Sequence, residues 1–241
     1  MPPNFLPAGP PIVTCAKLHE QQCQNPRVIT PMLGPRRSGL ETQVTMLATM
    51  PRIALRKATT MPVPAQTLRD LQEVGRDLYR MGLVTSHGGN ISVRDGHGMW
   101  ITGTNTMCGH LEAKHIAYVH PDGHAEGPPP SSDTILHATT YALSGAQAVV
   151  HAHPRHAIAM TFEGDAFFPL DFEGQLHLRS VPVIDLGPRQ VEQVAISLQS
   201  HLVVILRTHG AYARGQDAWE ALHWITALEE SAHIAWLRRG M

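Results

Sequence analysis

The stretch Val149-Val150-His151-Ala152-His153-Pro154 gives the clearest indication of how this chain folds and what it binds. Apolar residues that end at a proline predict a buried strand over residues 148–153. Side chains two positions apart on a strand point to the same face of the sheet, so His151 and His153 are expected to lie side by side. The pattern therefore predicts two imidazole rings that one metal ion could bind together.

A third histidine, His209, lies in Thr208-His209-Gly210, directly after an apolar run that predicts a strand over residues 202–206. Loops at the ends of strands are where functional sites are usually built. Three histidine ligands with an open fourth position are typical of a catalytic zinc site. His151, His153 and His209 are therefore the predicted ligands of Zn²⁺ or of a similar divalent ion such as Mn²⁺, Co²⁺ or Fe²⁺.

The histidine content leaves a second interpretation open. The chain has 16 histidines, and in such a sequence one His-x-His pair can arise by chance. His156 follows shortly after His153 and is either an alternative ligand or a group beside the ligands. His223 and His233 fall in the predicted C-terminal helix and are expected to be structural.

The rest of the chain predicts a mixture of strands and helices. Apolar residues recur at helical spacing from near Pro64 to Met81, and Gly82 follows as a stop signal. Because the elements show no strict β-α-β rhythm, the sequence favours an α/β fold with a central, mostly antiparallel sheet and flanking helices. The other expected strands cover 90–94, 99–102, 115–119 and 181–184, and the other expected helices cover 131–143, 155–162, 190–200 and 217–239.

Residues 1–62 differ from the rest of the chain in composition. The first 64 residues hold 11 of the 19 prolines, and residues 1–60 carry seven Lys and Arg against two acidic residues. The sequence therefore predicts a disordered extension over residues 1–62 and one folded domain over residues 63–241. A transit peptide and a start codon placed too far upstream are the alternative explanations of this stretch.

Composition excludes several classes of protein. Apolar residues make up 43% of the 241 and charged residues 16%, which is typical of a globular chain with a substantial core. The formal net charge of −1 predicts neither a nucleic acid nor a membrane partner, and no window has the ~18 uninterrupted apolar residues of a spanning helix. Three cysteines are too few for a disulfide framework, so a reducing compartment, the cytoplasm, is expected.

Small polar residues form a second group of candidates. Backbone N–H groups and hydroxyls at turns and helix starts are donors that can bind an anion. Turn formation and helix capping explain each motif alone, so the residues by themselves leave an anion site open. The candidates are Asn90 at the start of a predicted strand, Thr104 in the turn Thr102–Asn105, and Ser131 and Ser132 at the start of a predicted helix.

Together these motifs resemble the class II aldolase/adducin family, which contains sugar-phosphate aldolases and epimerases. The resemblance covers roughly residues 65–240 and rests on motifs that occur in the family's order and approximate spacing. They are Gly89–Arg94, Thr102–Asn105, Pro130–Asp133 with His137, Val149–His153 and Thr208–Gly210.

The resemblance implies more than the residues do alone. It implies a three-layer α/β/α sandwich, class II aldolase/adducin-like, in a homotetramer with active sites between subunits. It implies that Asp133 is the catalytic residue, because the family's aldolases carry at this position a glutamate that ligates the metal and acts as acid and base. It also implies a metal held by His151, His153 and His209, and a phosphorylated small-molecule substrate bound at Asn90, Thr104, Ser131 and Ser132.

Three positions depart from the family's pattern. Asp133 is shorter than glutamate by one methylene, about 1.5 Å of reach, so contact with the metal through water is more expected than a direct bond. The segment Phe168–Phe172 contains no counterpart of a tyrosine that an aldolase of the family brings from a neighbouring subunit. Asn105 stands where the family's phosphate loop often has glycine.

The leading hypothesis is a metal-dependent lyase of the aldolase type. It would cleave a carbon–carbon bond in a small hydroxy-carbonyl compound, a sugar phosphate, through a metal-stabilised enediolate, and Asp133 would transfer the proton. A Schiff-base mechanism needs a buried lysine. Lys114 is the only lysine after residue 62, and its polar neighbours predict that it is exposed.

Other functions remain open. A decarboxylase, a dehydratase and an epimerase acting on sugar phosphates in the same family need the same metal-held chemistry, so the ligands cannot separate them. A non-catalytic structural domain like the head of adducin is the alternative from another class. The retained His151, His153 and His209 argue against it, because that domain lacks the metal site.

Overall fold

The computed structural model describes residues 61–240, and nearly all of the predicted extension over residues 1–62 lies outside them. Every strand and helix expected from the sequence is present, with its ends shifted by a few residues. The helices are α1 (Ala65–Arg80), α2 (Thr134–Leu143), α3 (Arg155–Met160), α4 (Phe172–His177), α5 (Gln190–Ser200) and α6 (Ala218–Arg238), with 3-10 turns η2 (Cys108–His110) and η3 (Ala113–His115). The strands are β1 (Asn90–Asp95), β2 (Gly98–Thr102), β3 (Ile116–Val119), β4 (Ala125–Glu126), β5 (Ala148–Ala152), β6 (Ala166–Phe167), β7 (Val181–Ile184), β8 (Val203–Leu206) and β9 (Gly210–Gly215).

The strands form one sheet in the order β4-β3-β2-β1-β5-β9-β8-β7-β6. Neighbouring strands are antiparallel throughout, except that β7 and β8 run parallel. The predicted α/β fold is therefore confirmed, with a mixed sheet in which antiparallel pairs predominate.

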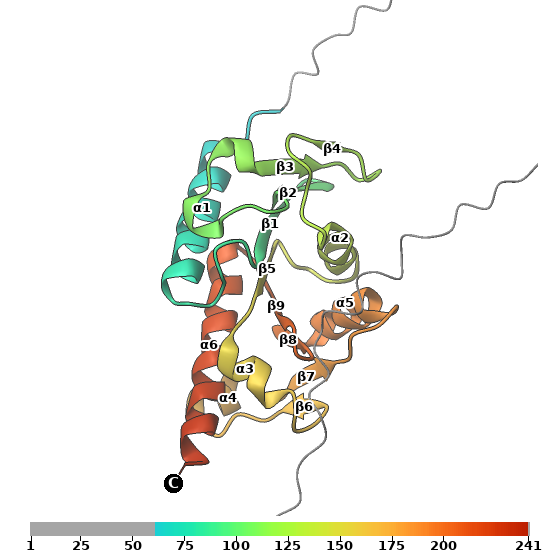
Figure 1. Ribbon diagram of the computed structural model, residues 1–241. Coiled ribbons are helices and arrows are strands. Elements are labelled where there is room, and N and C mark those ends of the chain that lie inside the picture. The colour runs from blue at the N-terminus through green and yellow to red at the C-terminus, as the bar shows by residue number, and fades with distance from the viewer. Residues whose placement is uncertain (1–60, 241) are drawn as a thin grey trace, which may run out of the picture. The chain divides into compact units, whose positions relative to one another are not determined.

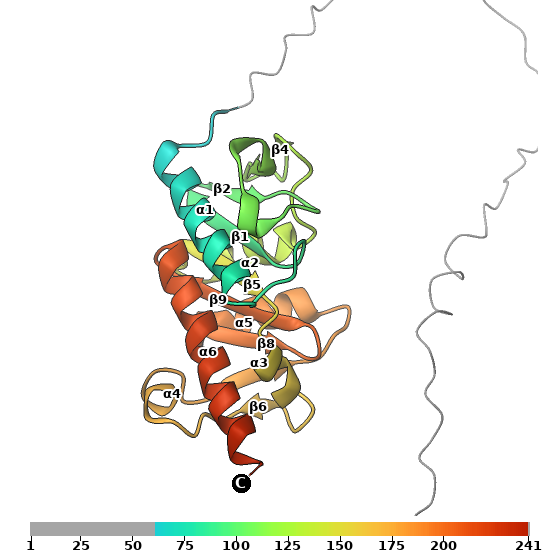
Figure 2. The same cartoon turned by 60° about the vertical axis from the view of Figure 1, so that its left-hand side comes forward.

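Helices lie on both sides of this sheet (Figure 1). On one side α1 and α6 pack against each other, and α6 contacts β1, β5, β8 and β9. Figure 2 shows α1 and α6 following one another along that side. On the other side α2 and α5 pack together, and α5 contacts β7, β8 and β9. No helix within residues 61–240 is both long and apolar enough to cross a membrane.

Successive side chains of β5 point to opposite faces of the sheet, which decides the face on which the candidate site lies. Val150 belongs to the core cluster that includes Leu71 of α1 and Ile225 of α6. Val149 packs in a different cluster, with Tyr141 of α2. Because alternate side chains of a strand share a face, His151 lies on the same side of the sheet as Val149, where α2 and α5 are found.

Three strands of the sheet were not predicted from the sequence: the two-residue edge strands β4 and β6, and the central strand β9. Strand β9 lies between β5 and β8, yet its sequence Gly-Ala-Tyr-Ala-Arg-Gly has no β-branched residue and has glycine at both ends. Helix α4 was also missed. It begins after Asp171, whose carboxylate accepts the N–H of Gly174 at 2.8 Å and so caps the helix.

Candidate metal centre

His151 lies at the centre of the candidate site, near the end of β5, and is only 3% exposed. Its Nδ1 donates to the carbonyl oxygen of Ala211 on β9 at 3.0 Å. Because a carbonyl can only accept, the ring proton is on Nδ1 and the lone pair of Nε2 is free. The ring of Tyr212 stacks on the imidazole with ring centres 4.1 Å apart, which holds the plane of the ring.

His153 and His209 bring two more nitrogens toward the same point. Nε2 of His153 lies 3.1 Å from Nε2 of His151. The ring of His209 lies nearly parallel to that of His151, with ring centres 5.0 Å apart. One ligand atom from each of the three residues lies within 4.8 Å of the other two. The structure therefore brings together the three histidines predicted as ligands.

Gly210 makes room for this arrangement. A Cβ atom at Gly210 would lie 2.4 Å from the carbonyl oxygen of Ala152, 2.7 Å from Cδ2 of His153 and 2.8 Å from Cε1 of His151. The glycine in Thr208-His209-Gly210 is thus required by the close approach of β9 to the two imidazoles.

Burial favours the neutral form of two of the predicted ligands, His151 and His153. It lowers the pKa of His151, although the charge of Asp133 opposes it, and it lowers the pKa of His153, with a further contribution from the charge of His209. Neutral imidazole is the form that binds a metal. At neutral pH neither His151 nor His153 has to lose a proton before it can bind an ion.

Asp133 stands at the start of α2 and faces the histidines. Its Oδ2 lies 3.9 Å from Nε2 of His151 and accepts hydrogen bonds from Nδ2 of Asn90 at 2.9 Å and from the hydroxyl of Tyr212 at 3.0 Å. Burial raises the pKa of Asp133, but the neighbouring imidazole of His151 and the hydrogen bonds from Asn90 and Tyr212 lower it by more, so that the pKa lies below its ordinary value. The carboxyl group is therefore ionised at neutral pH.

Tyr212 is the site residue that sequence reasoning missed. It contacts both a predicted ligand and the predicted acid/base group, because its ring stacks on His151 and its hydroxyl donates to Asp133. Burial and the charge of Asp133 raise the pKa of this hydroxyl, which keeps it a donor. The pairing of β5 with β9 places Tyr212 opposite His151. The only signal in the sequence was an aromatic residue three positions after His209.

Asn90 reaches the site through β1, where it lies opposite His151 in the register of β1 with β5. Its amide nitrogen donates to Asp133. Its amide oxygen is buried and has no hydrogen-bond partner among the described residues. The structure thus places Asn90 against the carboxylate, with an acceptor left for another molecule.

The other predicted substrate-binding residues come from two stretches that run side by side. The N–H of Ser131 donates to the carbonyl of Thr102 at 3.1 Å, and the N–H of Thr104 donates to that of Pro129 at 2.9 Å. Ser131 is buried, and its Oγ accepts the N–H of Asp133 at 3.3 Å. The side chains of Thr104 and Ser132 are exposed, so their hydroxyls are open to a ligand.

The backbone conformation of Asn105 explains why this departure from the family's pattern is tolerated. Its φ of 55° lies in the left-handed region, which glycine adopts freely and which asparagine tolerates better than most residues. Asparagine therefore preserves the shape of a loop that often carries glycine. A second departure, the segment Phe168–Phe172, runs from directly after β6 to the first residue of α4 and offers no tyrosine.

His137 extends the polar part of the site into the core. It lies one turn after Asp133 on α2 and is fully buried. Its Nδ1 is 2.7 Å from Oγ of Ser92, which is 2.6 Å from the hydroxyl of Tyr141. Burial lowers the pKa of His137 to about 4. The imidazole is therefore neutral at neutral pH.

Two other candidates from the sequence lie outside the group of ligands. Nδ1 of His156 pairs with Glu229 of α6 at 2.8 Å, and its ring stacks on His233 with ring centres 4.1 Å apart. Lys114 pairs with Glu112 at 3.0 Å, and its side chain is 68% exposed. The prediction that Lys114 is exposed is confirmed, so residues 61–240 hold no buried lysine of the kind that a Schiff-base mechanism needs.

Comparison with known families and proteins shows the family of this chain. The sequence pattern of the family described as Class II Aldolase and Adducin N-terminal domain matches residues 69–236. An L-fuculose phosphate aldolase of Methanocaldococcus jannaschii is 27% identical over 168 residues, which cover 68% of this chain and 93% of that protein. The L-fuculose phosphate aldolase of Escherichia coli K12 is 30% identical over 152 residues, which cover 60% of this chain and 71% of that protein.

Solved structures resemble the chain as well. L-fuculose-1-phosphate aldolase from Thermus thermophilus is 35% identical with a TM-score of 0.67, and the match covers 73% of this chain and 95% of that one. A sugar-phosphate aldolase from Thermotoga maritima is 23% identical with a TM-score of 0.58, and the match covers 70% of this chain and 93% of that one. At that identity the second likeness shows the fold alone.

Proposed function

Because this chain belongs to the class II aldolase and adducin family, we propose that it is a divalent-metal-dependent lyase of the aldolase type that cleaves a carbon–carbon bond in a sugar phosphate. One observation carries the proposal. The ligand atoms of His151, His153 and His209 lie within 4.8 Å of one another, and the carboxylate of Asp133 lies 3.9 Å from the first of them. We also take the fold to be the family's three-layer sandwich, since helices lie on both sides of the sheet.

The donor set fits Zn²⁺ and similar divalent ions. Imidazole nitrogens suit Zn²⁺ and Fe²⁺, and three histidines without a fourth protein ligand leave a position for substrate. The hydrogen bond from His151 to Ala211 orients the first ligand before any ion arrives. When bound, the ion would stabilise negative charge on the carbonyl and neighbouring hydroxyl oxygens of the substrate.

Asp133 would move the proton. Both of its side-chain hydrogen bonds end on Oδ2, so Oδ1 is the oxygen left for a substrate hydroxyl among the described residues. The carboxylate is ionised at neutral pH and can accept the hydroxyl proton as the carbon–carbon bond breaks. Asn90 and Tyr212 hold the carboxylate in place, and neither competes for Oδ1.

The phosphate would bind at the start of α2. The exposed hydroxyls of Thr104 and Ser132 can donate to it, and the first N–H groups of a helix favour an anion. The buried amide oxygen of Asn90, which has no partner among the described residues, would accept a hydroxyl of the substrate.

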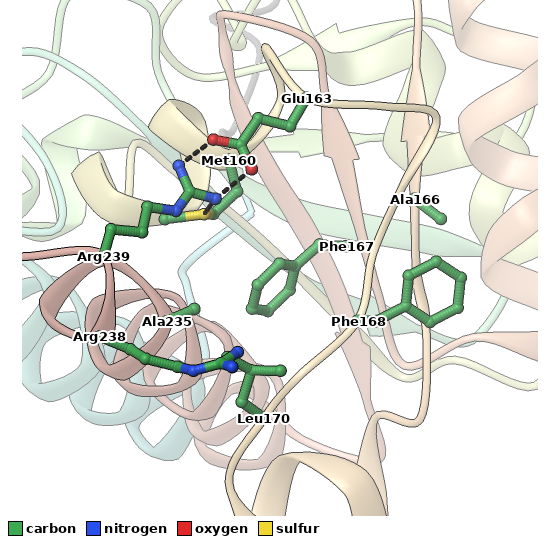
Figure 3. A pocket seen from close by; sticks show the side chains of 9 residues that line it. All are labelled: Met160, Glu163, Ala166, Phe167, Phe168, Leu170, Ala235, Arg238 and Arg239. Atoms are coloured by element: carbon green, nitrogen blue, oxygen red, sulfur yellow. Dashed lines mark hydrogen bonds and ion pairs between the residues drawn. The ribbon is translucent and has the colours of Figure 1, made fainter. Parts of the chain in front are cut away.

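Exposed apolar residues support a homotetramer with sites between subunits. Phe167, Phe168 and Leu170 line a hollow beside the end of α6, where Arg239 pairs with Glu163 (Figure 3). Phe168 is 64% exposed, and apolar patches of this kind on soluble proteins commonly mark interfaces. Light scattering of the full chain tests this part of the proposal, because a monomeric mass would contradict it.

Turnover of the metal-loaded protein tests the proposed reaction. The first substrate is L-fuculose 1-phosphate, because the relatives carry its name, followed by other ketose phosphates. We expect release of an aldehyde that stops when the metal is chelated and returns when Zn²⁺ is added. A metal-loaded protein that cleaves no ketose phosphate would contradict an aldolase.

A second reaction of the same family is favoured by two departures, Asp133 in place of glutamate and the lack of tyrosine in Phe168–Phe172. Nuclear magnetic resonance of the same mixtures distinguishes a decarboxylase, a dehydratase and an epimerase by loss of carbon dioxide, loss of water or inversion at one carbon. A protein that binds no metal would instead favour the non-catalytic structural role.

A further inference from the structure

The turn that presents His209 has an unfavourable backbone conformation. Thr208 has a φ of 60°, in the left-handed region. A β-branched residue rarely adopts this conformation, and it persists only where surrounding contacts enforce it. His209 follows directly, so the conformation of Thr208 determines where the third ligand lies.

A buried hydroxyl at the end of α3 contacts this turn. The N–H of Thr208 donates to Oγ1 of Thr161 at 3.2 Å. Thr161 is fully buried, and its hydroxyl donates in turn to the carbonyl of Ile158 at 2.7 Å. The hydroxyl is therefore held in one orientation, with a lone pair directed at Thr208.

Arg207 also joins the turn before His209 to the segment that follows α3. Its guanidinium donates to the carbonyl oxygens of Thr161 and Gly164. It also pairs with Asp185 at 2.5 Å and Asp165 at 2.7 Å. Arg207, directly before the strained position, thus has several fixed neighbours.

Helix α3 joins two of the three ligands. At its start, Pro154 follows His153 directly, and Glu229 of α6 accepts the N–H groups of His156 and Ala157. At its end, Thr161 holds Thr208. The helix therefore spans the distance between His153 and the turn that carries His209.

We infer that Thr161 is a positioning residue for the metal centre. Its buried hydroxyl holds Thr208 in the left-handed conformation and so places His209 opposite His151 and His153. This inference rests on the proposed function, because it assigns the hydroxyl a role in binding the metal.

The test compares Thr161→Val, which removes the hydroxyl at nearly constant shape, with Thr161→Ser, which keeps it. Zn²⁺ affinity is measured by competition with a chelator, and the visible absorption of the Co²⁺-loaded protein reports ligand geometry. We expect Thr161→Val to weaken Zn²⁺ binding by about 10–100-fold, the range for groups that orient metal ligands, and to change the Co²⁺ spectrum. Thr161→Ser should restore both.

Thr140→Val is the matched control, because Thr140 is a fully buried threonine whose hydroxyl donates to the carbonyl of Leu136 in the same helix. It should leave affinity and spectrum unchanged. If Thr161→Val does not fold, Thr161→Cys replaces it, because a thiol is a weak acceptor.

The outcomes separate the two proposals. Wild-type affinity and spectrum in Thr161→Val, or in Thr161→Cys where that variant is used, would overturn the role of Thr161 and leave the metal site intact. A wild-type protein that binds neither Zn²⁺ nor Co²⁺ would overturn the proposed function itself. An equal loss in Thr161→Val and Thr140→Val would show a general effect of removing a buried hydroxyl, and would also overturn the inference.

Discussion

Two clusters of histidines in this chain differ in where their ring nitrogens point. His151, His153 and His209 each direct one nitrogen toward a common point, within 4.8 Å of the other two. His156 and His233 stack with ring centres 4.1 Å apart, and Nδ1 of His156 points to the carboxylate of Glu229 rather than to another histidine nitrogen.

The partner of each ring explains the difference. Nδ1 of His151 donates a hydrogen bond to a backbone carbonyl, which leaves Nε2 free to bind a metal ion. Nδ1 of His156 forms a hydrogen bond with the carboxylate of Glu229, which also accepts backbone N–H groups at the start of α3. The first bond prepares an imidazole to bind a metal, whereas the second fastens a helix to its neighbour. Residue type alone therefore does not identify a ligand; what matters is which nitrogen stays free and where it points.

The largest effect is expected from replacing a histidine of the first cluster, compared with the same replacement in the second. His151→Ala should abolish stoichiometric metal and turnover, because two imidazoles remain where three are needed. His156→Ala, the matched variant in the other cluster, should keep both. Metal per chain, measured by mass spectrometry on purified protein, decides the matter. Unchanged metal in His151→Ala would place the site elsewhere and remove the distinction between the clusters.

Asp133 tests whether the first cluster is more than a place to hold an ion. Asp133→Asn should keep near-normal metal but lose about 10²–10⁴-fold in turnover, the usual contribution of a positioned acid/base group. Asp133→Glu should retain the ion. Metal content and turnover are measured on the same preparations. Full activity in Asp133→Asn would exclude Asp133 as the proton-transfer group.

His137 belongs to neither cluster and shows what burial alone does to an imidazole. Its pKa falls from 6.5 in the ordinary state to about 4 in the fold, so between these values the unfolded chain binds more protons. The free energy of unfolding is therefore not reduced by this group above about pH 6.5. It falls as the pH falls toward 4, in total by on the order of 3 kcal/mol. His137→Gln in the metal-free protein should therefore unfold with a shallower dependence on pH. Denaturation curves of the two proteins that stay parallel from pH 7 to 4 would contradict this.

The smallest effect is expected from removing residues 1–60, because this change alters neither histidine cluster. The backbone N–H of Met61 donates to Glu126 at 3.0 Å, so a chain that starts at Met61 keeps this contact and places its α-amino charge beside a carboxylate. Its circular dichroism, melting temperature and metal content should match those of the full chain. A large loss of stability would show that residues 1–60 stabilise the domain, and a loss of metal would give them a part in the site.

Much of this architecture could be predicted from local patterns. The apolar run that ends at Pro154 predicts a buried strand, and its period of two places His151 and His153 on one face. Helical periodicity predicts α1 and α6, because each must bury one apolar stripe against the sheet. The motif Thr208-His209-Gly210 marks the third ligand as a residue at a strand end. These inferences succeed because the physical cause lies within a few residues of the observed pattern.

Other features depend on contacts between residues far apart in the chain. Local propensity does not predict β9, because its small residues serve the close approach of Gly210 to the imidazoles of β5 rather than the pleat of a strand. Without that strand nothing placed Tyr212 beside Asp133, 79 residues earlier, or His151. Likewise the hydroxyl of Thr161 meets Thr208 across 47 residues. The local sequence identifies the chemical groups, but only the packing of distant segments decides which nitrogen is free, which oxygen is left for a proton and which backbone conformation is enforced.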